Sequence, residues 1–325
     1  MLRIMISSLI LAMGLVFCQA GQVDASAPAV SLFGDGIVAE TGEGPIWDPV
    51  TSRLLWVDIE GHRVLVSDPE SGNTEVHEVP AAPGTVVPSK DGEWIVALKD
   101  GIYSYREAHR TIRKVAVPDD LTDAVRFNDG KCDPRGRFWV GTVDTVRYAD
   151  PIAALYRLEG SAVTRVLGGV TISNGIAWAP DGTRMYYIDT PTRKVVAYDY
   201  NLETGELCKG VDAILIPEGW GDPDGCTIDS EGMLWVALWG GYAVSRWNPE
   251  TGECLQRISL PVKHVTAMAF GGEGLDIMFI TTAKASWAGL DEPDAGKLFV
   301  CRPGVKGLNA HLFDPFDKGS SLIHP

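Results

Sequence analysis

Short apolar runs separated by turn residues recur along the chain, and long helical periodicity is almost absent. A typical unit is DPRGRFWV at residues 133–140, in which a polar turn leads into an aromatic and β-branched run. Such units are typical of β-hairpins, because the turn residues tolerate tight or positive-φ geometry between strands. Comparable units occur at residues 48–57, 91–96, 133–140, 180–188, 230–236 and 272–280.

A second marker follows some of these units and predicts the turn into an outer strand. It reads DPESG at 68–72, NLETG at 201–205 and NPETG at 248–252. A period in the forties with about four strands per unit is typical of a β-propeller, and six units fit between residues 35 and 306. A β-sandwich would explain the strands but not the fixed period. We therefore predict an all-β fold, a six-bladed β-propeller.

The first twenty residues predict a segment outside this fold. Arg3 precedes an apolar run from Ile4 to Phe17, and small residues follow at the end, as in a secretory signal peptide cleaved near Gly21. A buried N-terminal helix is the alternative. The run is too short to span a membrane, and no second apolar stretch of that length follows, so no membrane partner is expected. We predict an exported protein, periplasmic or secreted.

The rest of the chain divides into three parts. We expect an N-terminal linker over residues 21–32, a propeller domain over 33–312 and a C-terminal tail over 313–325. As an alternative, the segment from Leu32 to Val38 closes the last blade as its outer strand.

Charge and cysteine content exclude several functions. Asp plus Glu number 43 against 28 for Lys plus Arg, a net charge of −15, and such an acidic chain repels the phosphates of nucleic acids. Five cysteines remain after residue 20, with no CxxC motif, and no HExxH motif occurs. Cys208 and Cys254 occupy equivalent outer positions of neighbouring repeats, which we expect to be too far apart for a disulfide.

Alignment of the repeats reveals one position that is polar in most of them. These positions, 41 to 50 residues apart, are Glu43, Gly84, Asn128, Asn174, Asp224 and Thr266. Equivalent positions on the innermost strands of a propeller face the central channel at one height. The two carboxylates and two amides should therefore converge, although each motif read alone is a simple turn. We call these six positions the polar column.

A convergent set of carboxylate and amide oxygens predicts a divalent cation in the channel. Oxygen-only ligands suit a hard ion, so Ca²⁺ is expected first, with Mg²⁺ and Mn²⁺ as alternatives. Zn²⁺ remains an alternative because it also accepts carboxylates.

Several separated motifs, in order, resemble the regucalcin/gluconolactonase family, also called the senescence-marker-protein lactonase family. The motifs are EGPIWD at 43–48, RFNDGK at 126–131, ISNG at 172–175, YIDT at 187–190 and PDGC at 223–226. The similarity covers nearly all of residues 33–310. It implies a six-bladed propeller with one divalent ion in its channel and hydrolysis of a small-molecule lactone, in typical members a sugar lactone.

The resemblance also implies roles for individual residues. Glu43, Asn174 and Asp224 correspond to the metal ligands, Arg126 and Asn128 to substrate contacts, and Asp224 to the general base. An alternative role for Arg126 is a salt bridge. Sugar lactonases of the family often carry an acidic substrate contact where this chain has Val146. Asp144 is close in sequence and is a candidate replacement.

The residues themselves suit ester chemistry. A cation beside the lactone carbonyl would stabilise the oxyanion that forms in the tetrahedral intermediate, and Asp224 could activate water. Two alternatives remain open: a broader arylesterase or organophosphate hydrolase resembling paraoxonase, and a non-catalytic metal- or ligand-binding propeller. Several aromatic residues either wall the pocket or pack between blades: Trp220, Trp239, Tyr242 and Trp287. His264 either faces the channel or is structural.

Overall fold

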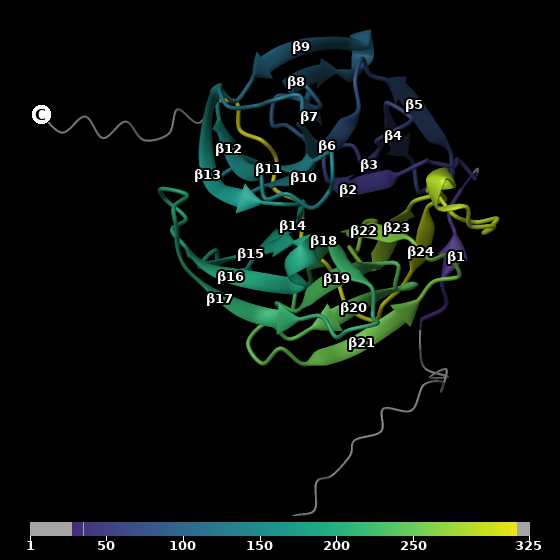
Figure 1. Cartoon of the computed structure of the whole chain (residues 1–325). Coiled ribbons are helices and arrows are strands. Elements are labelled where there is room, and N and C mark those ends of the chain that lie inside the picture. The colour runs from purple at the N-terminus through teal and green to yellow at the C-terminus, as the bar shows by residue number, and fades with distance from the viewer. Residues whose placement is uncertain (1–27, 35, 317–325) are drawn as a thin grey trace, which may run out of the picture.

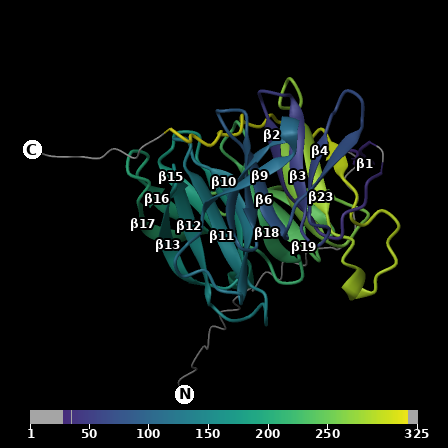
Figure 2. The same ribbon diagram turned by 90° about the horizontal axis from the view of Figure 1, so that it is seen from above.

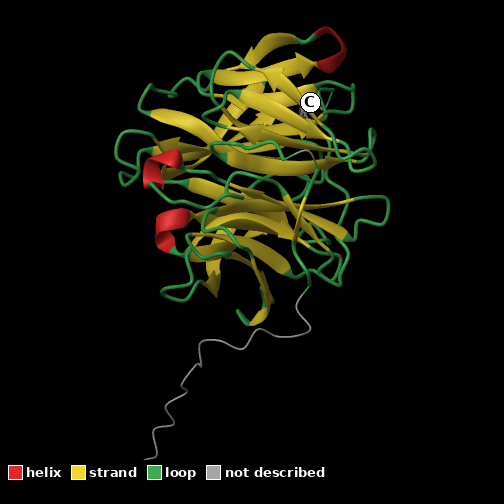
Figure 3. Ribbon diagram, turned by 90° about the vertical axis from the view of Figure 1, so that its right-hand side faces the viewer, coloured by secondary structure: helices red, strands yellow, loops and turns green. Residues whose placement is uncertain are grey.

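The computed structural model describes residues 28–34 and 36–316. Over these residues the chain forms twenty-four strands and three single-turn 3₁₀ helices (Figure 3). The strands make six antiparallel sheets of four strands each around a common axis (Figure 1), which confirms the predicted six-bladed β-propeller. The signal peptide predicted over residues 1–20 lies outside the described residues.

Each blade begins with its innermost strand at the channel, and blades are numbered here in chain order. Blades 1 to 3 contain β2 (Gly42–Asp48), β3 (Arg53–Asp58), β4 (Arg63–Ser67) and β5 (Thr74–Glu78); β6 (Pro83–Pro88), β7 (Trp94–Leu98), β8 (Gly101–Arg106) and β9 (Thr111–Ala116); and β10 (Val125–Cys132), β11 (Phe138–Asp144), β12 (Ala153–Glu159) and β13 (Ala162–Val170). Blades 4 to 6 contain β14 (Ser173–Trp178), β15 (Arg184–Asp189), β16 (Lys194–Tyr200) and β17 (Leu207–Leu215); β18 (Asp222–Ile228), β19 (Leu234–Trp239), β20 (Ala243–Trp247) and β21 (Cys254–Ser259); and β22 (Val265–Gly271), β23 (Ile277–Thr282), β24 (Phe299–Cys301) and β1 (Ser31–Leu32). The three helices are η1 (Glu107–His109), η2 (Thr190–Thr192) and η3 (Ser286–Ala288).

The hydrophobic core lies between neighbouring blades. Apolar side chains on facing strands form continuous clusters, so that Leu55 of blade 1, Val96 of blade 2 and Val140 of blade 3 belong to one buried group. All three are fully buried. Because each sheet buries both of its faces against its neighbours, the inner strands read as nearly continuous apolar runs.

Buried aspartates hold the turn units of blades 3 and 5. The Asp133 carboxylate accepts hydrogen bonds from the Trp139 indole at 2.9 Å and from Arg137 Nε at 2.6 Å. In blade 5, Asp229 accepts the equivalent bond from the Trp235 indole at 3.0 Å. The turn residue is therefore tied to the tryptophan of the strand that follows, which satisfies two buried polar groups at once.

The predicted turns into the outer strands are confirmed before β5, β17 and β21. In the turn before β17, Asn201 Oδ1 accepts the amide N–H groups of Glu203 and Thr204 at 3.0 and 3.1 Å. Gly205 ends the turn with φ +68°, a backbone conformation that glycine adopts without the steric cost of a Cβ.

The N-terminal strand closes the ring by completing blade 6. Ser31 and Leu32 of β1 pair antiparallel with Val300 and Phe299 of β24. The folded domain therefore begins before residue 33, and the end of the predicted linker belongs to a blade. The alternative closing segment was Leu32 to Val38, and only its first residue, Leu32, lies in the strand. Phe33 N–H adds one hydrogen bond next to the strand, to Leu298 O at 2.8 Å.

The C-terminal segment 306–314, called here the C-terminal strap, crosses one end of the propeller. Ser230 N–H of blade 5 donates to Lys306 O at 2.8 Å, and Phe313 N–H donates to Pro88 O of blade 2 at 2.9 Å. Figure 2 shows this segment along the face opposite to the loop that carries η3. The prediction that the tail starts at residue 313 is therefore wrong, because Phe313 is buried and packs in the core of blades 1 to 3.

Replacing Phe313 with alanine should lower the free energy of unfolding by about 3–5 kcal/mol, the usual cost of emptying a buried phenylalanine site. Urea unfolding followed by circular dichroism measures this change. The matched control is Phe316→Ala, whose side chain is 75% exposed and whose loss should change stability by less than about 0.5 kcal/mol. Equal stability of the two variants would show that the strap does not contribute to the fold.

The cysteines of the described residues agree with one further expectation. Cys208 and Cys254 are both free thiols on the outer strands of neighbouring blades, as predicted. Within residues 28–34 and 36–316, no helix has the length and apolar character needed to cross a membrane.

Candidate active site

A cavity of about 520 Å³ opens at the end of the channel where Thr190 of η2 and Trp287 of η3 line it. Its lining includes Glu43, Asn128, Asn174 and Asp224, which come from the innermost strands of four different blades. These residues are remote in sequence, and the repeat spacing correctly predicted that they meet. The other ends of the same strands, with the strap, line a second cavity of about 410 Å³.

The innermost strands share a local irregularity at the polar column. The pairing of β2 with β3 shifts between Glu43 and Ile46, and the other five innermost strands shift at the equivalent place: Pro83/Thr85, Phe127/Gly130, Ser173/Ile176, Pro223/Cys226 and Val265/Ala267. A β-bulge bends the strand and re-aims its side chain. The repeated bulge therefore turns the same position of each blade toward the channel.

Two positions of the polar column do not contribute to the cavity. Gly84 lies so close to blade 3 that a Cβ there would come within 2.5 Å of the Phe127 carbonyl carbon and oxygen. Thr266 directs its hydroxyl to Gly42 O of blade 1 at 2.6 Å. The first position has no room for a side chain, and the second joins blades 6 and 1.

Hydrogen bonds fix the two asparagines. Asn128 Nδ2 donates to Ser173 O at 2.8 Å and to Asn174 Oδ1 at 3.0 Å. Asn174 Nδ2 donates to Thr190 Oγ1 at 2.8 Å, and that hydroxyl donates to Pro223 O at 2.8 Å. The chain of bonds joins blades 3, 4 and 5 and turns both amide oxygens in defined directions.

Three buried carboxylates surround the channel at this level. Burial raises the pKa of Glu43 to about 8, and the neighbouring Asp129 carboxylate adds to that rise. Burial, then repulsion from Glu43, raises the pKa of Asp224 well above its ordinary value. Burial likewise raises the pKa of Asp129, which Lys131 partly offsets. Sequence reasoning missed Asp129, whose only signal is its place directly after Asn128.

This donor set fits a divalent cation. Glu43, Asn174 and Asp224 offer only oxygen ligands, and all three side chains are at least 94% buried. Carboxylates that repel one another in a buried site are costly unless they are protonated or paired with positive charge. A hard cation between them would remove that cost, because oxygen-only ligands suit a hard ion.

Comparison with known proteins agrees with this architecture. The family model of the SMP-30/gluconolactonase/LRE-like region matches residues 41–284. The chain belongs to the SMP-30/gluconolactonase family. The family includes gluconolactonases and sugar lactonase homologues, so this member has a lactonase-like function at that coarse level.

Several known proteins align with most of the length of this chain. YvrE of Bacillus subtilis, whose name provisionally assigns it as a sugar lactone lactonase, is 40% identical over 80% of this chain and 90% of its own. Regucalcin of Danio rerio is 38% identical over 84% and 95% of the two chains. The solved structure of a calcium-binding regucalcin from Agrobacterium tumefaciens aligns with a TM-score of 0.81 at 26% identity, over 89% and 97%.

Arg126 lies in the cavity of this family member, as the resemblance implies. Its Nη1 donates to Asn128 Oδ1 at 2.6 Å and to Phe127 O at 2.9 Å. Arg126 and Asn128 are two residues apart on β10, and both line the cavity. The bonds to the protein fix the guanidinium beside the asparagine, where its other N–H groups can donate to a ligand.

Asp144 is bound to its own loop instead of pointing at the cavity. Its carboxylate accepts the amide N–H groups of Val146, Arg147, Ala149 and Asp150 at 2.8–3.3 Å. Burial acts to raise its pKa, but these bonds lower the pKa to about 2. The lining contains neither Asp144 nor Val146, so this geometry supports a loop-holding role and not the substrate contact expected from the sequence.

Replacing Asp144 with alanine should therefore loosen residues 146–150. Four amide groups lose their acceptor, so their hydrogen exchange should become at least about 10-fold faster. Exchange measured by mass spectrometry tests this, with exposed strand residues of blade 4 as the internal reference. Unchanged exchange together with weaker substrate binding would restore the substrate-contact hypothesis.

Some of the aromatic residues singled out in the sequence line the cavity, and others pack between or outside the blades. Trp239 and Trp287 line the cavity, whereas Trp220 packs on Trp247, with ring centroids 5.9 Å apart. Tyr242 is 42% exposed outside the lining. Tyr148, which sequence reasoning did not select, joins the wall. The ring of His264 stacks on Trp239 at 4.2 Å and does not line the cavity, which favours a structural role.

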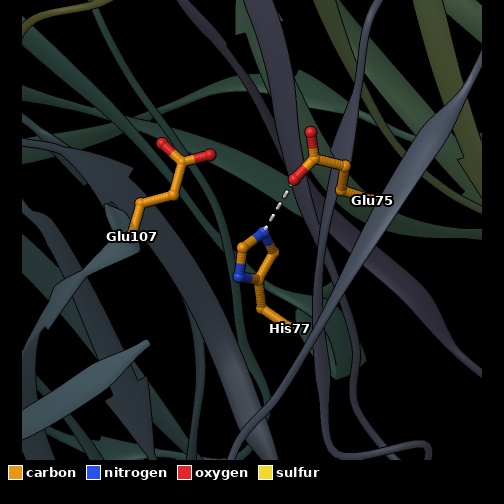
Figure 4. A group of neighbouring side chains, drawn as sticks. All are labelled: Glu75, His77 and Glu107. Atoms are coloured by element: carbon orange, nitrogen blue, oxygen red, sulfur yellow. Dashed lines mark ion pairs between the residues drawn. The ribbon is translucent and has the colours of Figure 1, made fainter. Parts of the chain in front are cut away.

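A second acidic cluster lies at the outer edge of blades 1 and 2 (Figure 4). Ligand atoms of Glu75, His77 and Glu107 lie within 4.8 Å of one another. Both Glu107 oxygens accept Arg53 donors at 2.7 Å, and His77 Nδ1 is 3.1 Å from Tyr105 Oη. Arg53 balances the charge of Glu107. The carboxylates of the channel site, in contrast, repel one another.

Proposed function

We propose that this chain is a cation-dependent hydrolase that opens a lactone ring. The observation that carries the proposal is the meeting of Glu43, Asn174 and Asp224, from three blades, with Arg126 and Asn128 in one cavity. The carboxylates can hold a cation, and the Arg126 guanidinium can donate hydrogen bonds beside it. Both features suit a substrate whose carbonyl oxygen becomes negative in the transition state.

The proposed cation is Ca²⁺, with Zn²⁺, Mn²⁺ and Mg²⁺ as alternatives, held by Glu43, Asn174 and Asp224. When bound, it supplies positive charge that stabilises the oxyanion formed from the lactone carbonyl. Regucalcin of Agrobacterium tumefaciens is described as a calcium-binding protein, which supports calcium as the first choice.

Asp224 is the proposed general base. Its carboxylate accepts a proton from a water molecule as the water oxygen bonds to the carbonyl carbon. The ring C–O bond then breaks, and the leaving alkoxide takes the proton back from Asp224, which yields a hydroxy acid. Its burial supports this role, because a desolvated carboxylate is a stronger base than one in water.

Arg126 and Asn128 are proposed to orient the lactone. The free N–H groups of Arg126 can bond the ring oxygen or the carbonyl oxygen while the water attacks. Asn128 lies on the same face of β10 and holds the guanidinium through its Oδ1, since its own amide donates to Ser173 O and Asn174 Oδ1. Fixed donors need no reorganisation as the charge develops, which is the basis of their expected effect on rate.

The test is a pH-indicator screen of lactones beside aryl esters and phosphotriesters, after chelation and addition of single cations. We expect hydrolysis of lactones to depend on a divalent cation and to exceed that of the other substrates in kcat/KM. Preference for aryl esters or phosphotriesters would indicate the broader hydrolase. Tight cation binding with no turnover of any substrate would indicate a non-catalytic propeller.

A further inference from the structure

The wall of the channel cavity is largely aromatic and aliphatic. Tyr148, Trp239 and Trp287 line it together with Ile59, Val143 and Ile172. Trp287 is 62% exposed and Tyr148 is 50% exposed. Large apolar surfaces left uncovered at the rim of a cavity are typical of a ligand-binding wall.

Neighbouring residues hold the segments that carry the three aromatic side chains. Trp239 ends strand β19 and stacks on His264. Trp287 lies in η3, where the Glu40 carboxylate accepts Ser286 N–H at 2.6 Å and Ser286 Oγ–H at 2.9 Å.

Tyr148 lies within the loop whose amides Asp144 binds. Its φ of +53° is a conformation that a bulky residue adopts only when its surroundings hold it there. Asp144, which the sequence suggested as a substrate contact, therefore helps to hold Tyr148 in the cavity wall by binding its loop.

Most polar groups of the lining are committed to protein partners. Asn174 and Thr190 belong to the hydrogen-bond chain across blades 3 to 5, and Asp222 accepts Arg193 Nη1 at 2.6 Å. A site that selects a polyhydroxylated ring needs a partner for each hydroxyl, because an unpaired hydroxyl in the complex loses its hydrogen bonds to water.

One buried hydroxyl lacks a partner in the cavity. Thr41 is 8% exposed, and its Oγ1 has no hydrogen-bond partner among the described residues. Thr41 precedes Glu43 by two residues and lines the same cavity. An unpaired buried hydroxyl costs about 1–3 kcal/mol unless a ligand bonds to it. Apart from the free N–H groups of Arg126, which the proposed mechanism uses on the ester, the cavity therefore offers one internal hydroxyl contact, with Glu60 exposed at the rim.

We propose that the substrate is a lactone that carries an apolar ring or chain on its lactone ring, not a polyhydroxylated sugar lactone. The reactive ester lies at Glu43 and Asp224, one polar substituent is bonded by Thr41, and the apolar group packs on Tyr148, Trp239 and Trp287. This inference rests on the proposed lactonase function. It departs from the sugar lactones of typical family members because Val146 is exposed and Asp144 is occupied.

Three δ-lactones with the same six-membered ring provide the test: δ-valerolactone, its phenyl-substituted derivative and glucono-δ-lactone. We expect kcat/KM for the phenyl lactone to exceed that for glucono-δ-lactone at least about 10-fold, since burial of one apolar group is worth about 10- to 200-fold. Spontaneous hydrolysis is subtracted from every rate. Equal or faster turnover of glucono-δ-lactone would overturn the inference and leave the lactonase function intact.

Trp287→Ala tests the wall itself. It should lower kcat/KM for the phenyl lactone at least about 5-fold more than kcat/KM for unsubstituted δ-valerolactone, because only the former buries its ring there. Phe316→Ala, which removes an exposed aromatic ring outside the cavity, should change neither value. Equal losses for both substrates in Trp287→Ala would overturn the inference.

Binding of unreactive lactams separates this inference from the proposed function. Calorimetry with the phenyl-substituted δ-lactam and with gluconolactam needs no turnover. We expect the phenyl lactam to bind at least about 10-fold more tightly, and Trp287→Ala to remove most of that difference. If no lactone is hydrolysed, the lactonase function fails while this binding preference still supports the apolar site. Equal or weaker binding of the phenyl lactam would overturn it.

Discussion

Asp224→Asn is expected to lower kcat/KM for lactone hydrolysis at least about 10²-fold. Asparagine keeps the shape of the side chain but cannot accept a proton from water, and its neutral oxygen binds a cation more weakly. Asp224 is buried in the cavity beside Glu43, where solvent cannot substitute for the missing base. Steady-state rates on the best lactone of the screen, with saturating cation, measure the effect.

Asp199→Asn is the matched control for this variant. It removes one carboxylate from an exposed position of β16, outside the cavity, and should leave kcat/KM within about twofold of the original. The cation content of the Asp224→Asn variant distinguishes the two roles of Asp224. If Asp224 acts only as the base, the variant keeps its cation. If Asp224 is also a ligand, the variant loses it. Full activity of Asp224→Asn would rule out the proposed mechanism.

Chelation is expected to reduce lactone hydrolysis to background and to make stability depend strongly on pH. The folded cation-free protein holds a proton on Glu43, whose pKa is raised from 4.5 to about 8 by burial first and by Asp129 second. Between these pH values the unfolded chain has released that proton. Stability of the cation-free protein therefore falls as pH rises from about 4.5 to about 8, and below that window the contribution is fully present.

Added cation should reverse this loss. It competes with the proton, so the rise in melting temperature caused by Ca²⁺ should be larger at pH 8 than at pH 5.5. At 100 times its dissociation constant a bound ion adds about 2.7 kcal/mol, which for a domain of this size corresponds to a rise of about 4–5 °C. Scanning fluorimetry at the two pH values measures it. Glu43→Gln is the control, because it removes the titrating group, and an unchanged pH trend in that variant would contradict the assignment.

The repeat pattern was sufficient to predict the architecture. Asp133 and Asp229 occupy equivalent turns of blades 3 and 5, and each one bonds a tryptophan of the next strand within its own blade. Local interactions of this kind are encoded by neighbouring residues. The period therefore predicted both the six blades and the meeting of Glu43, Asn128, Asn174 and Asp224.

Interactions between remote segments were beyond this pattern. Phe313 looks like part of a polar tail in sequence, yet it packs in the core of blades 1 to 3, far earlier in the chain. Asp144 looks like a free carboxylate near a substrate position, but the path of the following loop turns four amide groups toward it. The C-terminal strap and the loop after Asp144 each occur once in the chain, so the repeat pattern does not predict their course.

By itself the sequence determined the propeller, the height of the polar column and the oxygen-only character of its donors, since these depend on residue type and spacing. Only the tertiary structure decided which column positions reach the cavity. Gly84 is excluded by the backbone of the next blade, and Asp129, beside the bulge at Asn128, lies near enough to act on the carboxylates of Glu43 and Asp224. Such choices depend on distances of a few ångströms between blades, which side-chain packing sets and residue spacing does not encode.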